Sequence, residues 1–139
     1  MPPQGNNMPQ TITVLFVDDD EMNCKVFKRY FSRLDNIEVV TALSAHEAME
    51  NLERHKDAFS IVITDQRMPS IKGHQLLDHV RENSPETLRA LTSANQEEIE
   101  LLFKRTDSAV LIQHFFNKPW DFELITDIIY SSQLNKLIY

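Results

Sequence analysis

The sequence predicts an α/β domain built on a five-stranded parallel sheet. Five short apolar runs, rich in β-branched residues, alternate strictly with five stretches whose apolar residues recur at helical spacing. Such alternation predicts right-handed crossovers and helices on both faces of the sheet. The chain has 139 residues, the size of one domain. No G-x-G-x-x-G or G-x-x-x-x-G-K-[ST] motif follows any run, so the dinucleotide-binding and P-loop classes lose their main support.

The composition sets limits on the kind of protein. Residues 1–10 are rich in Pro, Asn and Gln and predict a disordered tail, with the folded domain at 11–135 and a tail or linker start at 136–139. No apolar run is long enough to span a bilayer, and the single cysteine fits a reducing, cytoplasmic setting. The net charge of −7 argues against a non-specific nucleic-acid surface.

Each predicted strand is an apolar run that stops at a polar residue or a turn. The first covers 11–17 (TITVLFV) and stops at four acidic residues. The second covers 37–41, and the third, at 60–64, is the run of Val and Ile most typical of a buried strand. The fourth, at 87–92, is less apolar, and the fifth covers 113–117.

The first two helices follow from apolar spacing and from caps. Residues 22–34 are predicted to be helical because five apolar side chains share one face: Val26, Phe27, Tyr30, Phe31 and Leu34. Asp20 and Glu21 are expected to cap and charge the start of this helix. Ser44 and Glu47 stand in capping-box register, which predicts a second helix over 45–56.

The remaining helices are bounded by glycine, proline and capping residues. Gly73 opens the third helix, which should end before Pro85. Asn95 opens the fourth, with Glu98 three residues later. Its expected buried stripe consists of Ile99, Leu102 and Phe103. Asp121 caps the last helix, which runs towards Leu134.

Side chains that can bind a metal ion or a phosphoryl group lie at the carboxyl ends of four of the five predicted strands. Asp18 and Asp19 follow the first, Asp65 the third, Thr92 ends the fourth, and Lys118 follows the fifth. Because the carboxyl ends of parallel strands share one edge of the sheet, these residues should converge. Three such carboxylates repel, which raises the pKa of at least one unless a cation joins them, and Mg²⁺ prefers these oxygen ligands. Asp65 is then a carboxylate nucleophile, with the Lys118 ammonium and the Thr92 hydroxyl available to a phosphoryl group.

The chain resembles the receiver domains of two-component response regulators. The matching stretches are LFVDDDE, IVITDQRMPSIKG, LRALTSA and HFFNKPW, and they cover about 11–134. The resemblance implies a flavodoxin-like (βα)5 fold with strand order 2-1-3-4-5. It implies that Asp65 accepts the phosphoryl group and that Asp18, Asp19 and Asp65 bind Mg²⁺ with the backbone carbonyl of Arg67. The remaining site residues that it implies are the switch hydroxyl of Thr92, the switch aromatic Phe115 and the lysine Lys118, whose bond to Pro119 is a candidate cis peptide.

The resemblance also implies a mechanism and partners. A histidine kinase or a histidine phosphotransfer protein donates the phosphoryl group, and the domain catalyses its own phosphorylation and dephosphorylation without turning over a free substrate. Thr92 and Phe115 then shift the surface formed by the fourth helix, fifth strand and fifth helix, which is also a possible homodimer face. No direct nucleic-acid or membrane binding is expected. Two departures are Ser93, where alanine or glycine is usual, and a slightly long connection at 104–112, part of which could prolong the fourth helix.

Two other functions compete with phospho-acceptance. A phosphatase of the haloacid-dehalogenase type would use Asp18-Asp19-Asp20, yet it needs a cap domain and an acidic pair after the lysine, whereas Asp121 and Asp127 fall in a helix. A pseudo-receiver would bind a partner and never take phosphate.

Several other residues have structural interpretations. Cys24 is expected to pack, Trp120 to pack the turn against the last helix, and the five histidines to lie at the surface or its boundary, while Phe115, Phe116 and the last helix fit either a core or a partner face.

Overall fold

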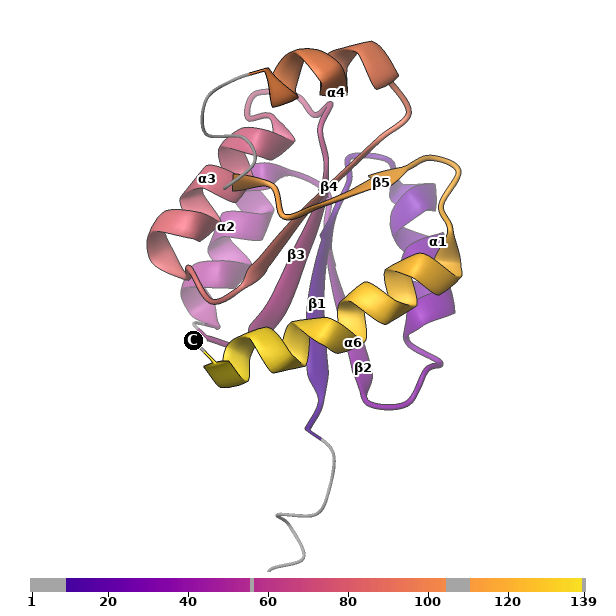
Figure 1. Cartoon of the computed structure of the whole chain (residues 1–139), viewed down its shortest axis with the longest axis vertical. Helices are drawn as coiled ribbons and strands as arrows, with labels where there is room; N and C mark the ends of the chain where they lie inside the picture. Colours follow the sequence, from indigo (N-terminus) through magenta and orange to yellow (C-terminus); the bar gives the residue numbers. More distant parts are fainter. Residues whose placement is uncertain (1–9, 56, 105–110, 139) are drawn as a thin grey trace, which may run out of the picture.

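The computed structural model describes residues 10–55, 57–104 and 111–138 (Figure 1). Its strands form a single five-stranded sheet in the order β2-β1-β3-β4-β5, and every neighbouring pair is parallel. The strands are β1 (Ile12–Val17), β2 (Ile37–Ala42), β3 (Phe59–Asp65), β4 (Leu88–Ser93) and β5 (His114–Asn117). The helices are α1 (Glu21–Phe31), α2 (Ala45–Arg54), α3 (Gly73–Asn83), α4 (Gln96–Phe103) and α6 (Phe122–Ile138). The predicted fold class and strand order are confirmed.

The sheet separates two layers of buried side chains. Alternate residues of β1 point to opposite faces, so Phe16 lies on one side and Leu15 on the other. Helices α1 and α6 cover the first face, and we call the buried residues there the α1/α6 layer (Figure 1). Helices α2, α3 and α4 cover the second, the α2/α3/α4 layer. Packing of such apolar faces, rather than intrinsic helix propensity, supplies most of the stability of helices in proteins.

The α1/α6 layer is rich in aromatic rings, whereas the other layer is mainly aliphatic. Phe16 and Phe27 stack with ring centroids 4.1 Å apart, and Phe27 also contacts Phe31 at 4.4 Å. The α2/α3/α4 layer instead contains Leu76, Leu77 and several other aliphatic side chains. Among the described residues, most of the ring contacts therefore lie on the α1/α6 side of the sheet.

Side-chain caps set the start of the helices as predicted. The Asp20 carboxylate accepts hydrogen bonds from the backbone N–H of Met22 at 2.8 Å and of Asn23. The Ser44 hydroxyl accepts the N–H of Glu47 at 3.1 Å, and the Asn95 side chain accepts the N–H of Glu98 at 3.0 Å. In the same way the Asp121 carboxylate accepts the N–H of Leu124 at 3.1 Å. Each such cap stabilises its helix by about 1 kcal/mol.

Gly73 ties the start of α3 to the end of β3. A Cβ at this position would overlap the backbone carbonyl oxygen of Asp65, so a larger residue would push α3 away from the strand. The Gly73 N–H donates to the carbonyl of Gln66 at 3.0 Å. Glycine is therefore needed here for close approach, and it fixes the loop that follows Asp65.

Several details differ from the predictions. Val26 is 42% exposed and Phe103 is also 42% exposed, although both were expected to face the core. Helical spacing identifies one face of a helix, but the width of the face that becomes covered depends on the neighbouring elements. Helix α2 ends at Arg54 rather than at residue 56, β5 begins at His114, and α6 continues to Ile138, past its expected end near Leu134.

Other predictions lie outside the described residues. The tail is one of them, apart from Gln10, and most of the 104–112 connection is another. The division at residue 135 stays a prediction. Within the described part of the chain, no helix combines the length and apolarity that crossing a membrane requires.

Candidate functional site

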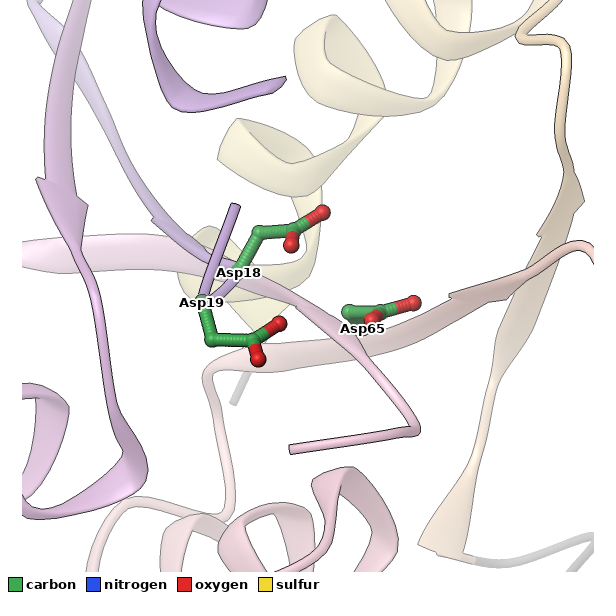
Figure 2. A group of neighbouring side chains, drawn as sticks. All are labelled: Asp18, Asp19 and Asp65. Carbon is green, nitrogen blue, oxygen red and sulfur yellow. The ribbon is translucent and has the colours of Figure 1, made fainter. Parts of the chain in front are cut away.

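Three carboxylates meet at the carboxyl edge of the sheet, as predicted (Figure 2). Asp18 follows β1, Asp19 lies in the loop before α1, and Asp65 is the last residue of β3. One oxygen from each carboxylate lies within 4.8 Å of the others. Asp18 and Asp65 are buried, whereas Asp19 is exposed. Strands β1 and β3 are parallel neighbours with Val17 opposite Thr64, so Asp18 and Asp65, which follow these residues, come together at the edge of the sheet.

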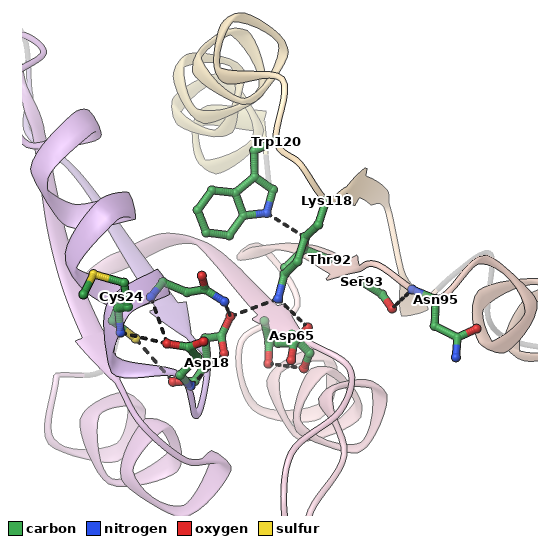
Figure 3. A network of polar contacts seen from close by, with 12 residues as sticks. Asp18, Cys24, Asp65, Thr92, Ser93, Asn95, Lys118 and Trp120 are labelled. Carbon is green, nitrogen blue, oxygen red and sulfur yellow. Dashed lines mark hydrogen bonds and ion pairs between the residues drawn. The ribbon is translucent and has the colours of Figure 1, made fainter.

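Lys118 bridges two of the three carboxylates (Figure 3). Its Nζ donates to Asp18 Oδ2 at 3.2 Å and to Asp65 Oδ1 at 3.1 Å. Asp18 also accepts the backbone N–H of Asp20 at 2.9 Å and the Asn23 side-chain amide at 3.0 Å. These bonds orient Asp18 from both sides, so its carboxylate is held in place before any ligand binds.

The pKa values reflect burial and crowding. Burial raises the pKa of Asp65 above its ordinary value, Lys118 opposes this rise, and the charges of Asp18 and Asp19 add to it. Burial alone would lower the pKa of Lys118, but the attraction of Asp65 and Asp18 raises it. The predicted rise in one carboxyl pKa is found, with burial rather than repulsion as the largest cause.

The donor set fits a divalent cation that prefers oxygen. The three carboxylates supply oxygen ligands only, and the exposed position of Asp19 leaves room for bound water. Mg²⁺ retains several waters and is held by few carboxylates in proteins, which matches this arrangement. A cation there would also offset the mutual repulsion of the carboxylates. The contribution of the Arg67 carbonyl stays a prediction.

Thr92 lies beside Asp65 but bonds to a residue that the sequence analysis did not connect to it. Thr92 is fully buried and pairs with Asp65 in the β3–β4 register. The Trp120 indole Nε1 donates to Thr92 Oγ1 at 2.9 Å (Figure 3). Trp120 also packs edge-to-face on Phe122 with centroids 6.2 Å apart, as expected for a residue that holds the turn against the last helix. The requirement of a buried indole N–H for an acceptor was the signal that could have revealed this bond.

Phe115 lies on the opposite side of the sheet from Trp120. It is partly buried, packs against the α2/α3/α4 layer and contacts the Phe103 ring edge-to-face at 6.4 Å. The neighbouring Ser93 hydroxyl accepts the backbone N–H of Asn95 at 3.0 Å, so the serine helps to shape the start of α4. Phe115 is therefore near the site without reaching the carboxylates.

A hollow of about 450 Å³ opens beside Asp65. Its lining residues come from the ends of β3 and β4, the start of α4 and Lys118: Asp65, Arg67, Ser93, Ala94, Asn95, Gln96, Glu97 and Lys118. The exposed Arg67 side chain pairs with Glu98 at 3.1 Å and so joins the loop after β3 to α4. The opening gives a ligand access to Asp65 from solvent.

Gln66 is a second residue whose role the sequence did not reveal. Its Oε1 accepts the backbone N–H of His74 at 2.8 Å, and its Nε2 lies 2.8 Å from His74 Nδ1. The side-chain amide nitrogen of Gln66 can only donate, so Nδ1 of His74 accepts. The proton of the neutral His74 ring therefore lies on its own Nε2. These two bonds anchor the start of α3 next to Asp65.

Cys24 packs as expected. Its Sγ lies 3.3 Å from the carbonyl oxygen of Asp18, and burial raises the pKa of the thiol to about 11. The side chain therefore stays a neutral thiol near pH 7, which makes it a poor nucleophile. Among the described residues, the histidines join no metal-binding group.

A doubly wound parallel sheet with an acidic cluster and a lysine at its carboxyl edge is the arrangement of a receiver domain. The chain belongs to the response regulator receiver domain family, whose model matches residues 14–130. Receiver domains act in two-component signalling, generally bind Mg²⁺ at an acidic pocket and interact with histidine kinases or phosphotransfer proteins. This membership argues against the phosphatase alternative, as does the capping role of Asp121 in α6.

Similar proteins support the same family. The hydrogenase transcriptional regulatory protein HoxA of Cupriavidus necator is 32% identical over 108 residues, which cover 78% of this chain and 21% of that protein. The structure of an adenylate cyclase from Rhodopirellula baltica matches with a TM-score of 0.77 and 27% identity, over 91% of this chain and 90% of that one. A signal receiver domain of an HD domain-containing protein from Pseudomonas fluorescens has a TM-score of 0.82 at 21% identity, covers 94% of this chain and 100% of that one, and shows the fold.

The coverage of the curated relatives is partial. The chain spans between 11% and 29% of the length of those that it matches. The activities of those whole proteins therefore do not transfer to it directly.

Proposed function

We propose that Asp65 accepts a phosphoryl group from a histidine kinase or a histidine phosphotransfer protein. The observation that carries this proposal is the cluster of Asp18, Asp19 and Asp65, together with the Lys118 bridge between two of its members. A structural role for this cluster is a poor explanation, because it buries like charges at a cost in folding free energy. Family membership supports the same conclusion.

The transfer follows from the orientation of Asp65. Lys118 holds Oδ1, which leaves Oδ2 to attack the phosphorus of a phosphohistidine. The new P–O bond forms as the P–N bond breaks, and the departing imidazole nitrogen keeps the electron pair. Lys118 then lies next to the added negative charge and stabilises it. No general base is needed, because an ionised carboxylate is already a nucleophile.

A metal ion fits this site, and its ligands are part of the proposal. Asp18, Asp19 and Asp65, with the Arg67 carbonyl, would hold Mg²⁺. When bound, the ion neutralises charge on the phosphoryl oxygens during transfer. Asp19 is exposed and Asp18 is fixed by Asp20 and Asn23, so one ligand can adjust while the other stays rigid.

Phosphorylation is proposed to change the surface of α4, β5 and α6. Thr92 turns towards the phosphoryl group, and Phe115 follows by packing inward next to α4. The partial burial of Phe115 and its edge contact with Phe103 leave room for such a change. This surface is also the proposed homodimer face, and hydrolysis of the acyl phosphate resets the switch.

The test is a titration with Mg²⁺ and beryllofluoride, a phosphoryl mimic, followed by ¹H–¹⁵N NMR. We expect the resonances around Thr92 and Phe115 to shift in the wild type and in Asp127→Asn, which removes an exposed carboxylate of α6. Asp65→Asn should abolish the response. An unchanged wild-type spectrum would contradict the proposal and favour a domain that only binds a partner.

Chemical labelling separates phospho-acceptance from hydrolysis. Acetyl phosphate should label the wild type once, and Asp65→Asn should take up none. Catalytic turnover of a small phosphate ester, without accumulation of labelled protein, would instead support the phosphatase class.

A further inference from the structure

Trp120 occupies an unusual place between the site and the α1/α6 layer. Its indole packs edge-to-face on Phe16, with centroids 5.4 Å apart, and on Phe27 at 5.6 Å. At its other end the indole N–H donates to Thr92 Oγ1 at 2.9 Å (Figure 3). One side chain therefore connects the residue beside Asp65 with two rings that pack between β1 and α1.

The strand register explains why Trp120 reaches the hydroxyl and Phe115 does not. Thr92 pairs with Phe116, whereas Leu91 pairs with Phe115. Paired residues of adjacent strands point to the same face of a sheet, and successive residues point to opposite faces. Because Phe116 belongs to the α1/α6 layer and Leu91 to the other, Thr92 faces the α1/α6 layer. Its side chain meets Trp120 there.

The chemistry of the two groups makes this contact a restraint. An indole N–H can only donate, whereas a hydroxyl both donates and accepts. Within the described residues, Thr92 Oγ1 accepts from Trp120, and the Asp65 carboxylate is bound by Lys118 rather than by Thr92. Because the same oxygen can still donate, the indole bond restrains the position of Oγ1 rather than its hydrogen. The turn of Thr92 towards a phosphoryl group, which the proposed function assumes, moves Oγ1 away from the indole and breaks this bond.

We propose that Trp120 is a positioning residue that holds the Thr92 hydroxyl in the resting state. When Asp65 is phosphorylated, Thr92 exchanges the indole N–H for a phosphoryl oxygen. The freed indole then changes its packing on Phe16 and Phe27, so the change reaches α1 as well as α4. This inference rests on the proposed function of Asp65 and adds a second path, through the α1/α6 layer.

The bond can be observed directly, because Trp120 is the only tryptophan of the chain and gives a single indole N–H resonance. In the absence of ligand, Thr92→Val removes the acceptor and should shift this resonance upfield, as expected for loss of a hydrogen bond. Mg²⁺ with beryllofluoride should shift the wild-type resonance in the same direction. In Thr92→Val, adding Mg²⁺ and beryllofluoride should not shift the Trp120 indole resonance any further.

The outcomes distinguish this proposal from the function that it assumes. If the Asp65 amide responds to beryllofluoride while the indole resonance stays in place or moves downfield, the exchange is refuted and phospho-acceptance stands. If neither responds, both proposals fail. If Thr92→Val leaves the indole resonance unchanged without ligand, the resting bond itself is refuted.

A second variant measures the strength of the restraint. Trp120→Phe keeps an aromatic ring but removes the indole N–H. Beryllofluoride bound to Asp65 then no longer competes with that N–H for the Thr92 hydroxyl. We expect beryllofluoride to bind about two- to tenfold more tightly, the range that one net hydrogen bond supports. Phe122→Leu is the matched control, because Phe122 contacts the Trp120 ring without bonding to Thr92, and it should change the affinity less than about twofold. Unchanged or weaker binding in Trp120→Phe would overturn the proposal.

Discussion

The two layers of this domain contact the carboxyl edge of the sheet in different ways. The α1/α6 layer reaches the site through a part-buried, uncharged hydrogen bond between Trp120 and Thr92. In the α2/α3/α4 layer, hydrogen bonds from Gln66 to His74 anchor α3 beside the site. Helix α4 reaches the site through the exposed ion pair of Arg67 and Glu98, and its Phe103 meets Phe115 edge-to-face. The indole bond is directional and partly shielded from solvent, whereas the ion pair that joins α4 to the loop after β3 is open to water and salt.

This difference indicates how each layer can respond. Ring contacts have preferred angles, so a displaced indole disturbs the rings that pack against it. An exposed ion pair contributes little to stability and is screened by salt, so α4 is held loosely at this point. Helix α4 buries only Ile99 and Leu102, and Leu101 is 65% exposed. We infer that α4 shifts at low cost, whereas a change in the α1/α6 layer costs more and is better defined.

The largest expected effects on the free energy of unfolding come from truncating one buried side chain in each layer. Phe27→Ala removes a fully buried ring that touches Phe16, Phe31 and Trp120, and should lower the free energy of unfolding by about 3–5 kcal/mol. Leu77→Ala in the other layer should cost about 2–5 kcal/mol. Urea unfolding measures both changes.

Tryptophan fluorescence of the folded variants sharpens this comparison. Phe27→Ala should change the emission of Trp120, since it removes a ring that packs on the indole. Leu77→Ala should leave that emission unaltered, because Leu77 lies in the other layer. Equal changes in both variants would show that the layers are not independent.

A smaller effect is expected at the ion pair. Arg67→Ala should lower the free energy of unfolding by less than about 1 kcal/mol, and the loss should shrink as salt is added. A double-mutant cycle with Glu98→Gln isolates the pair, and the exposed Lys25–Glu21 pair of α1 offers a matched control. A larger coupling that is insensitive to salt would mean that α4 is held more firmly than the structure indicates.

The smallest effect concerns pH. His114 pairs with Ala90 on the α1/α6 side of the sheet, and burial lowers its pKa below the ordinary value of 6.5. The unfolded chain therefore binds more protons at this residue, so stability is lost as the pH falls from about 6.5. His114→Gln should make the loss shallower in urea unfolding measured at about pH 7 and about pH 5.5. An identical pH dependence would contradict this prediction.

The sequence predicted which side chains converge at the sheet edge better than it predicted the surface of the helices. Asp18, Asp19, Asp65 and Lys118 converge because polar residues at the ends of parallel strands share one edge, a rule that needs no knowledge of packing. Val26 was misjudged because spacing along a helix defines a face but not how much of it another element covers. Cap positions were predicted well, because a cap depends on residues only two or three positions apart.

The sequence by itself determined the alternation of strands and helices, the residues at each strand end and the family, because these depend on local spacing. Only the tertiary structure decided which side chains bond across the fold. Lys118 bonds to Asp18 across 100 positions and Trp120 to Thr92 across 28. Such pairs depend on strand order and on which face a residue occupies. For that reason the sequence predicted only that Trp120 packs a turn, whereas the structure shows that it connects Thr92 with the rings of Phe16 and Phe27.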